Sequence, residues 1–429
     1  MRTLSWVDIF RLGCVQTCLG AIVVLTTSTL NRLMVVELAL PAVLPGFLVA
    51  FYYGIQITRP NWGFRSDTRG NRSFFIIGGM IVLALGALIA AFAIDVLERF
   101  FGLGLAISIF SYGLIGIGVG ASGTSLLALL ATATKPIHRA AAATITWLMM
   151  IAGIAVTAAI IGQFLDPYSH FVLMRIVSII AISAIAVTSI AIWGIERRVD
   201  VSPQQESTPF IHGLKEIWAE QKARHFTVFV FLSMSAYFMQ ELILEPYSGL
   251  VFDFTPGQST TLSGVQNGGV FLGMVLVGIM VTGLRFGTIK FWVISGCVGS
   301  AIMLGLLAWI GQLGSHTPLV IVVIGLGVFN GMFAVAAIGA MMALAGDGRK
   351  AREGTRMGLW GAAQALAAGF GGLIGAASVD IFRQIFNYDS DAFGIVFLLE
   401  AILFVIAAIM AMRVINPHEL KRHSFAPGE

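Results

Sequence analysis

Charged side chains are scarce in this sequence. Asp, Glu, Lys and Arg together make up 11% of the 429 residues, whereas hydrophobic residues make up 57%. A soluble chain of this length needs a charged surface, so the composition excludes a water-soluble globular protein and predicts a polytopic membrane protein. The net charge of +4 indicates no basic face for nucleic acid, because the basic residues gather in alternate loops.

Cysteine is also rare, and histidine avoids the apolar runs. Cys14, Cys18 and Cys297 lie in apolar stretches, and two cysteines four apart on one helix lack the further ligands that zinc needs. None of the seven histidines falls at the middle of an apolar run, which argues against a permanently bound tetrapyrrole with a buried histidine ligand. We therefore expect no metal site and no permanent cofactor. No arrangement of acid, base or nucleophile indicates an enzyme.

Twelve apolar runs are each long enough to cross a bilayer, which takes about 20 helical residues. They predict an all-α membrane protein with twelve transmembrane helices. Asp8 and Arg11 precede the first run without a small-residue cleavage site, so we expect that run to be retained. The first run stops before a short polar break at Asn31 and Arg32. The runs cover residues 12–30, 41–58, 73–94, 101–132, 140–165, 171–195, 226–249, 260–283, 288–312, 318–344, 357–379 and 393–412.

Basic residues are distributed unevenly between alternate loops. Of the 26 Lys and Arg residues, 22 fall on one side of the predicted membrane. The four on the other side are Arg32, Arg99, Arg175 and Arg383. Loops rich in Lys and Arg stay in the cytoplasm, so both termini are predicted to be cytoplasmic.

One long hydrophilic stretch divides the apolar runs six and six. This stretch, residues 196–225, is predicted to be a cytoplasmic linker between an N-terminal half, residues 1–195, and a C-terminal half, residues 226–413. Residues 414–429 form a predicted cytoplasmic tail. Equal spacings in the two halves favour two pseudo-symmetric six-helix halves. The matched sets are Arg139, Trp147 and Gly162, and Arg352, Trp360 and Gly375.

Polar side chains inside the apolar runs are few, and a bilayer makes such groups costly unless they serve a function. Glu241 and Glu245 are four apart and share a helix face. With Glu37 they are predicted to form a carboxylate cluster at the periplasmic junction of the halves, with Arg32 as the expected counter-charge. Alternatively, these residues lie in wet outer loops and only anchor helix ends. The central runs of the N-terminal half offer mainly Ser, Thr and Gly, which predicts a largely apolar cargo. The candidate cargo-binding residues are Asn31, Arg32, Glu37, Gln240, Glu241, Glu245 and Asn267.

The charged loop 59–72 carries a spaced motif. Gly63, Asp67, Gly70 and Arg72 form the pattern G-x-x-x-D-x-x-G-x-R. The pattern resembles the loop between helices two and three of major facilitator transporters, which implies the major facilitator fold. In that family the glycines allow a tight turn and the Asp meets a helix N-terminus, so the four residues are predicted to form a cytoplasmic gate. The alternative is a basic loop with two turn glycines.

Four longer strings, residues 31–42, the loop through Arg72, residues 237–247 and residues 354–364, resemble the PucC/LhaA family. That family is the bacteriochlorophyll-delivery branch of the major facilitator superfamily in phototrophic bacteria. The resemblance implies antenna assembly in the bacterial inner membrane, cytoplasmic or intracytoplasmic, with bacteriochlorophyll or a late precursor as transient cargo. Antenna polypeptides and pigment-synthesis enzymes are the implied partners, within a lipid bilayer.

The resemblance leaves the branch of the family open. The chain is a peripheral-antenna factor, a core-antenna factor or a third member associated with late pigment synthesis. Two other functions also remain open from the residues. One is an exporter of a small amphipathic compound, and the other is a scaffold that contacts antenna helices and synthesis enzymes without moving anything.

Overall fold

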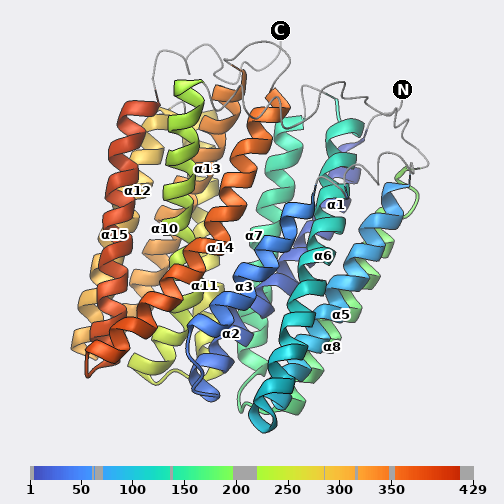
Figure 1. Cartoon of the computed structure of the whole chain (residues 1–429). Helices are drawn as coiled ribbons and strands as arrows, with labels where there is room; N and C mark the ends of the chain where they lie inside the picture. The colour runs from blue at the N-terminus through green and yellow to red at the C-terminus, as the bar shows by residue number, and fades with distance from the viewer. Residues whose placement is uncertain are drawn as a thin grey trace. The chain divides into compact units, whose positions relative to one another are not determined.

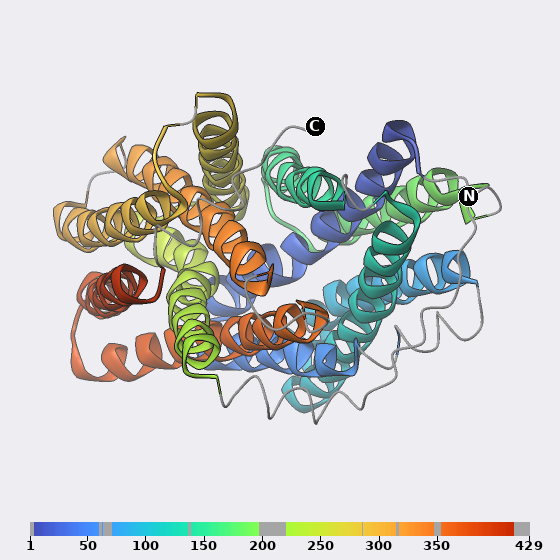
Figure 2. The ribbon, with the colours of Figure 1, turned by 90° about the horizontal axis from the view of Figure 1, so that it is seen from above.

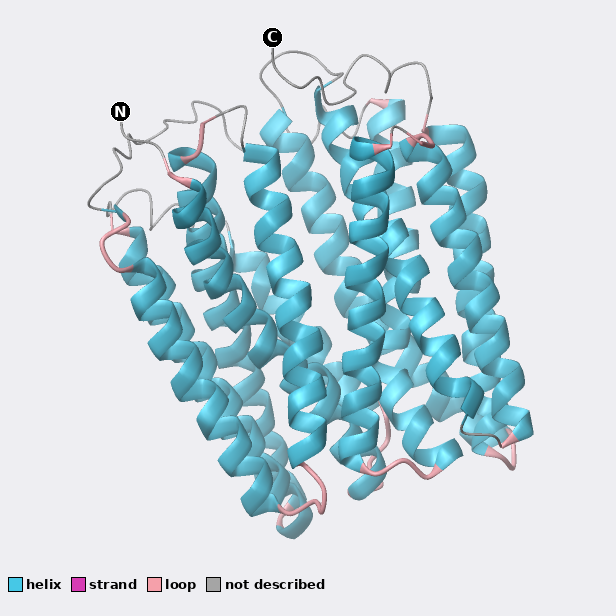
Figure 3. Ribbon diagram, turned by 180° about the vertical axis from the view of Figure 1, so that it is seen from behind, coloured by secondary structure: helices cyan, strands magenta, loops and turns pink. Residues whose placement is uncertain are grey.

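The computed structural model describes residues 4–59, 62, 71–135, 139–196, 220–284, 286–314, 317–346 and 353–415. Every regular element in these ranges is a helix (Figure 3). Eleven helices are long and apolar enough to cross a membrane, and Val43–Thr58 forms a shorter apolar helix. Each of the twelve predicted runs therefore corresponds to a helix.

The first half of the chain forms ten helical segments in its described part. They are α1 (Trp6–Val24), η1 (Leu25–Thr29), α2 (Leu30–Arg32), η2 (Leu33–Glu37), α3 (Val43–Ile55), η3 (Gln56–Thr58), α5 (Arg72–Arg99), α6 (Phe101–Ala133), α7 (Arg139–Phe164) and α8 (His170–Ile192). The second half continues with α10 (Gln221–Phe252), α11 (Pro256–Gly278), η6 (Ile279–Gly283), α12 (Ile289–Leu313), α13 (Thr317–Gly346), α14 (Glu353–Ile385) and α15 (Asp389–Val414).

Contacts divide the chain into two compact units. Unit 1 comprises Met1–Gln205 and Leu244–Asn267, and unit 2 comprises Glu206–Ile243 and Gly268–Glu429. Residues 244–267, the end of α10 and the start of α11, thus group with the N-terminal part of the chain. The division into two six-helix halves at the linker stays a prediction.

The first helix does not end at the polar pair Asn31 and Arg32. It runs without a break over Trp6–Glu37, because the π-helical segments η1 and η2 continue it on either side of α2. A π turn holds one residue more than an α turn, so each segment shifts the helix face by about 100°. Both polar residues are buried within this helix, and the break that the polar pair suggested is absent.

Hydroxyl groups support the first π segment. Thr26 and Thr27 both donate to the carbonyl oxygen of Val23, at 2.8 and 3.1 Å. Tyr112 of α6 donates to the carbonyl oxygen of Thr26 at 2.9 Å. Side-chain hydroxyls that bond to the preceding turn compete with the regular α-helical ladder. The Thr-rich stretch therefore favours the widened turn.

Side-chain caps fix where several helices begin. Ser5 and Asp8 form a capping box at α1. Asn71 accepts a hydrogen bond from the Phe74 N–H at the start of α5, and Ser169 and Thr288 play the same part for α8 and α12. Each cap satisfies one of the N–H groups that the first turn of a helix leaves without a partner.

Within each unit, long helices pack in pairs. In Figure 1, α5 of unit 1 runs beside α6 and α8, and α12 of unit 2 runs beside α13 and α15. Figure 2, with the helices nearly end-on, shows α15 next to α12. Glycines allow the closest approaches. In unit 2, a Cβ atom on Gly331 of α13 would overlap the backbone carbonyl oxygen of Val270 on α11, so these helices touch through their backbones.

The contact at Gly331 gives a first prediction. Replacing Gly331→Ala forces α11 and α13 apart, because the obstructing atom belongs to the backbone and cannot rotate away. We expect the free energy of unfolding to fall by about 1–3 kcal/mol and the melting temperature in detergent to fall with it. Gly305→Ala on α12 is the control, since nothing lies within 4 Å of the added Cβ. It should melt at or above the original temperature, because Ala favours a helix. Equal melting of the two variants would contradict the backbone contact.

Candidate functional site

Arg32 is the centre of a buried polar group in unit 1. Its side chain is 2% exposed. The guanidinium donates to a carboxylate oxygen of Glu37, to the carbonyl oxygen of Phe254 at 2.6 Å and to the Ser259 hydroxyl at 3.4 Å. A Cβ atom on Gly249 would lie 3.2 Å from Nη2 of Arg32, so the guanidinium rests against the backbone of α10. Arg32 thus ties the first helix to the turn between α10 and α11.

The π segment η2 makes the contact between Arg32 and Glu37 possible. Residues five apart on an α-helix point about 140° away from each other. The wider π turn brings position 37 back toward position 32. Glu37 remains 35% exposed at the helix end, so the buried cation is neutralised by a carboxylate that still reaches water. Of the predicted carboxylate cluster, Glu37 is thus the member that pairs with Arg32.

Glu245 lies in the same group but makes no such pair. It is 1% exposed, and neither carboxylate oxygen has a hydrogen-bond partner in the part of the chain that the structure describes. The hydroxyls of Ser28 and Ser263 lie next to it together with Arg32, yet the two hydroxyls bond to each other at 2.9 Å. Pro246, inside α10, follows directly and supplies no N–H.

We call this group the Arg32 cluster. Two further hydroxyl pairs belong to it: Ser248 donates to Ser259 at 2.9 Å, and the hydroxyl oxygens of Thr29 and Thr260 lie 3.4 Å apart. All of its members belong to unit 1. The members are Ser28, Thr29, Arg32, Glu37, Glu245, Ser248, Ser259, Thr260 and Ser263.

The other predicted cargo residues lie in α2, α10 and α11. Asn31 is buried in α2, and half-buried Asn267 donates to the carbonyl oxygen of Ser263 at 3.0 Å. Gln240 is 1% exposed, and its amide oxygen has no hydrogen-bond partner among the described residues. Glu241 is half-buried beside it on α10, and both belong to unit 2. Of the seven residues, Asn31, Arg32, Gln240 and Glu245 are buried within helices and Glu37 is exposed at a helix end; that they bind cargo stays a prediction.

The predicted gate loop is described only at its end. Gly63, Asp67 and Gly70 lie outside the described residues. Arg72 is buried at the start of α5 and donates to the carbonyl oxygen of Ala128 on α6 at 3.2 Å. Whether the four residues act as a gate stays a prediction.

Glu196 is a residue at this end that sequence reasoning missed. Its carboxylate accepts hydrogen bonds from the backbone N–H groups of Arg72 and Ser73, at 2.7 and 2.9 Å. A carboxylate at a helix N-terminus satisfies free donors and complements the helix dipole. The sequence places Glu196 at the start of the hydrophilic linker, more than a hundred residues from α5, so no local pattern signals this contact.

Asp166 makes a comparable cap at the other end of unit 1. Its carboxylate accepts from the Thr255 hydroxyl and from the Gly257 N–H, the latter at 3.0 Å. The turn between α7 and α8 is thereby fastened to the start of α11. This was also missed, because the capping residue comes from another helical pair.

A cluster of titratable groups lies beside that turn. Asp95, Glu98 and His170 place their ligand atoms within 4.8 Å of one another, and Nε2 of His170 lies 2.8 Å from a Glu98 oxygen. The hydroxyl of Tyr168 lies 3.2 Å from Nδ1 of His170. Burial raises the pKa of Tyr168 to about 12, and nearby carboxylates such as Glu37 add to the shift, so the phenol stays protonated at neutral pH. Arg99 occupies one Asp95 oxygen at 3.0 Å, and the group is partly exposed.

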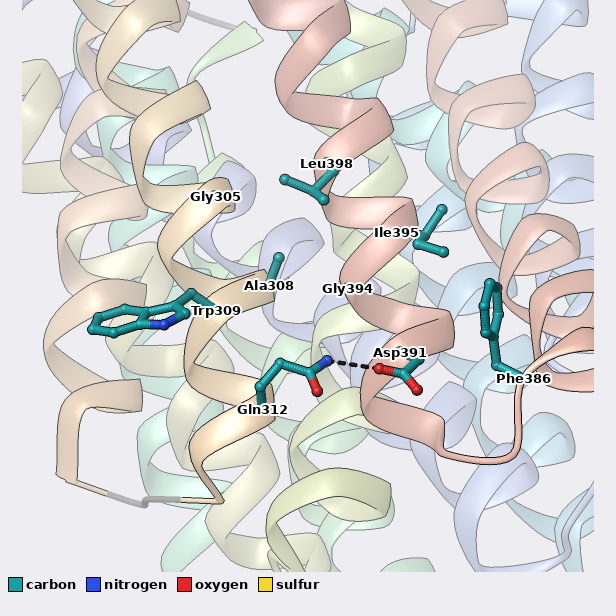
Figure 4. Close-up of a pocket in the computed structure, with 9 residues that line it drawn as sticks. All are labelled: Gly305, Ala308, Trp309, Gln312, Phe386, Asp391, Gly394, Ile395 and Leu398. Atoms are coloured by element: carbon teal, nitrogen blue, oxygen red, sulfur yellow. Dashed lines mark hydrogen bonds between the residues drawn. The ribbon is translucent and has the colours of Figure 1, made fainter.

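Unit 2 carries a groove of about 460 Å³ that contains none of the predicted cargo residues. Figure 4 shows Trp309, Ile395, Leu398 and Phe386 along it, with the Gln312 amide directed at Asp391. That hydrogen bond is 2.9 Å long. The groove is therefore apolar with one polar end. Its lining residues are Gly305, Ala308, Trp309, Gln312, Phe386, Asp391, Gly394, Ile395 and Leu398.

Comparison with known sequences gives a family match over most of the chain. The family model described as PUCC protein matches residues 29–419. The chain is 63% identical over 415 residues to the bacteriochlorophyll synthase 44.5 kDa chain of Rhodobacter capsulatus, covering 96% of each chain. It is 27% identical over 408 residues to protein PucC of Cereibacter sphaeroides, covering 90% of this chain and 85% of that one.

Solved structures with little sequence identity share the fold. A bacterial homolog of the human lysosomal transporter Spinster superposes with a TM-score of 0.67 at 13% identity over 98% of each chain. The nucleoside transporter NupG gives a TM-score of 0.70 at 15% identity, over 95% of this chain and 99% of that one. A peptide transporter of the POT family gives 0.71 at 14% identity, over 96% and 95%. The chain therefore has the major facilitator fold, as the loop motif implied.

The contact of Glu196 with the start of α5 yields a prediction. Glu196→Ala removes both hydrogen-bond acceptors from the first turn of α5. We expect the free energy of unfolding to fall by about 1–2 kcal/mol, measured as a lower melting temperature. Glu196→Gln keeps one acceptor oxygen and should lose less than Glu196→Ala. Asn71→Ala, which removes the ordinary cap of the same helix, sets the scale. Unchanged melting of Glu196→Ala would show that the contact adds nothing to stability.

Proposed function

The chain belongs to the PUCC protein family, and on that premise we propose that it handles bacteriochlorophyll during assembly of light-harvesting antennae. It binds the pigment, or a late precursor, and passes it to antenna polypeptides within the membrane. The observation that carries this proposal is the 63% identity, over 96% of both chains, to a protein named as a chain of bacteriochlorophyll synthase.

The same identity supports one branch of the family over the others. Proteins named PucC are 26–27% identical to this chain, far below the 63% of the synthase-named relative. We infer that the chain works with late pigment synthesis, at the step where finished pigment leaves the synthesising enzymes. We also propose that the chain itself is not catalytic, and acts as a membrane partner of those enzymes.

The chemistry of unit 1 supports an apolar cargo. Some of its buried hydroxyls bond within their own helices; Ser108 and Ser111, for example, donate to the carbonyl oxygens of Gly104 and Ser108, both at 2.8 Å. The Arg32 cluster lies at one end of the helices, beside the turns. A hydrophilic solute would need unspent hydrogen-bonding groups along its path. A chlorin needs mainly apolar surface and one or two polar contacts.

Gln240 is the best candidate for such a polar contact. Its buried amide oxygen has no hydrogen-bond partner in the described ranges. The magnesium of a bacteriochlorophyll takes an axial ligand, and a neutral amide oxygen is a hard donor that suits magnesium. A neutral ligand also lets the pigment leave again. Glu241, next to it, is the candidate for a contact with a ring substituent.

A spectrum tests the cargo. We expect the gently purified protein to carry a near-infrared absorption band of a bacteriochlorin. A scaffold would instead co-purify with synthesis enzymes or antenna polypeptides and show no such band. An exporter would be free of pigment and would move an amphipathic compound in an ion-gradient-dependent way. Either result in place of the band would reject pigment binding.

Substitution tests the residues. In a phototrophic strain that depends on this chain, Gln240→Leu combined with Glu241→Leu should lower the antenna level several-fold while the protein still accumulates. Gln16→Leu on α1 is the matched control, because that buried amide oxygen also has no partner within the described residues but is not a predicted cargo ligand. Normal antenna levels in the double variant would reject Gln240 and Glu241 as cargo residues.

A further inference from the structure

The Arg32 cluster contains one cation and two carboxyl groups. Arg32 is already neutralised by Glu37 and holds the carbonyl oxygen of Phe254 at 2.6 Å. Glu245 is left buried without a donor for either oxygen among the described residues. An ionised carboxylate in that position would be a second, uncompensated negative charge, which a buried site does not tolerate. The arrangement therefore fits a protonated Glu245.

We propose that Glu245 is a proton-binding site that decides which carboxyl group Arg32 pairs with. When Glu245 carries its proton, Arg32 pairs with Glu37, as in this structure. When Glu245 releases the proton to water, the carboxylate so formed becomes the better partner for Arg32, because it is buried and Glu37 is hydrated. Arg32 then pairs with Glu245 and loses its ion pair with Glu37 and its hydrogen bond to the carbonyl oxygen of Phe254.

The geometry allows this exchange without a large movement. Nη2 of Arg32 already rests against Gly249, and Gly249 lies one helical turn beyond Glu245 on the same face of α10. The absence of a side chain at Gly249 leaves the guanidinium free to slide along that face. The π segments on both sides of Arg32 give its helix two ways to bond its backbone, which is where helices commonly change shape.

The other titratable groups nearby do not compete for Arg32. Asp166 uses both carboxylate oxygens on Thr255 and Gly257. Tyr168 stays protonated because its pKa is raised to about 12, mainly by burial. Asp95, Glu98 and His170 lie around Tyr168 together with Glu37, and Glu241 lies one helical turn before Glu245 on α10. Of the charged groups among the described residues, Arg32 is the one that acts on Glu245.

The exchange has a mechanical consequence. Arg32 is the link between the first helix and the carbonyl oxygen of Phe254 in the turn 253–255. Loss of that link frees this turn from the turn 38–42 that follows η2. Protonation of Glu245 thus controls the contact between the turn 38–42 and the turn 253–255 within unit 1. It does not depend on the nature of the cargo, so the protein alone tests it.

The experiment measures the distance between the two turns. Spin labels go on Ala39→Cys and Asp253→Cys, both exposed, after Cys14, Cys18 and Cys297 have been replaced by Ala. Pulsed electron paramagnetic resonance in lipid nanodiscs records the label separation at several values between about pH 5 and pH 9. We expect a single short distance at low pH and a longer, broader distribution at high pH.

Two variants separate Glu245 from other titrating groups. Glu245→Gln mimics the protonated state, so the short distance should persist at every pH. Glu400→Gln is the matched control, because Glu400 of α15 is also a fully buried carboxyl group without a partner among the described residues. It should leave the pH response unchanged. A response that survives in Glu245→Gln, or an original protein with one distance at all pH values, overturns the proposal.

A second readout protects the test against a poorly folding variant. Infrared difference spectra of the original protein should show the carbonyl stretch of a protonated carboxylic acid that disappears as the pH rises. In Glu37→Gln, Arg32 loses its present partner and pairs with Glu245, so that signal should be lost at lower pH and the long distance should dominate. An acid signal that is identical in Glu37→Gln and the original protein contradicts the coupling.

Discussion

The structure of unit 1 depends on the cost of keeping one guanidinium away from water. Arg32 is 2% exposed inside a helix that is long and apolar enough to cross a membrane, and an arginine in such a place must be paired and hydrogen-bonded. Its partners come from the end of its own helix, from the turn after α10 and from α11. Residues 244–267 group with the N-terminal unit, and these contacts are among those that join them.

The location of the helices could be predicted from sequence because it depends on one property. A run of about 20 apolar residues crosses a bilayer whatever its neighbours are, and all twelve runs are helices. The end of the first helix could not be predicted in this way. The polarity of Asn31 and Arg32 predicts a loop when each residue is considered alone. Arg32 is buried in the helix because Glu37 and the carbonyl oxygen of Phe254 accept hydrogen bonds from its guanidinium.

The candidate site shows the same limit. Arg32, Glu37 and Glu245 could be selected because polar residues stand out in an apolar sequence. Their pairing could not, because it depends on a π turn that leaves no clear mark in the sequence. Glu196 and Asp166 were missed for a related reason. Each caps a helix that is distant in the chain, and in a hydrophilic stretch or a turn an acidic residue is unremarkable by composition.

Fold and family contribute different kinds of information. The solved structures resemble this chain over almost its whole length at 12–15% identity, and transporters of nucleosides and peptides are among them. Such a range of cargo on one fold means that the fold does not specify the cargo. The argument for a pigment therefore comes from the related sequences.

The two π segments of the first helix determine which residues face its neighbours. In a regular α-helix of this length, the same face would point to the same neighbours from one end to the other. The residues that pack against α7 and α8 at one end would then fix which residues face those helices at the other end. The extra residue in η1 and the extra residue in η2 each rotate the residues that follow relative to those that precede. A related chain that lacks the extra residue of η1 would show a one-position gap there in an alignment, and its residue at the position of Arg32 would be rotated by about 100° away from the partners that Arg32 has here.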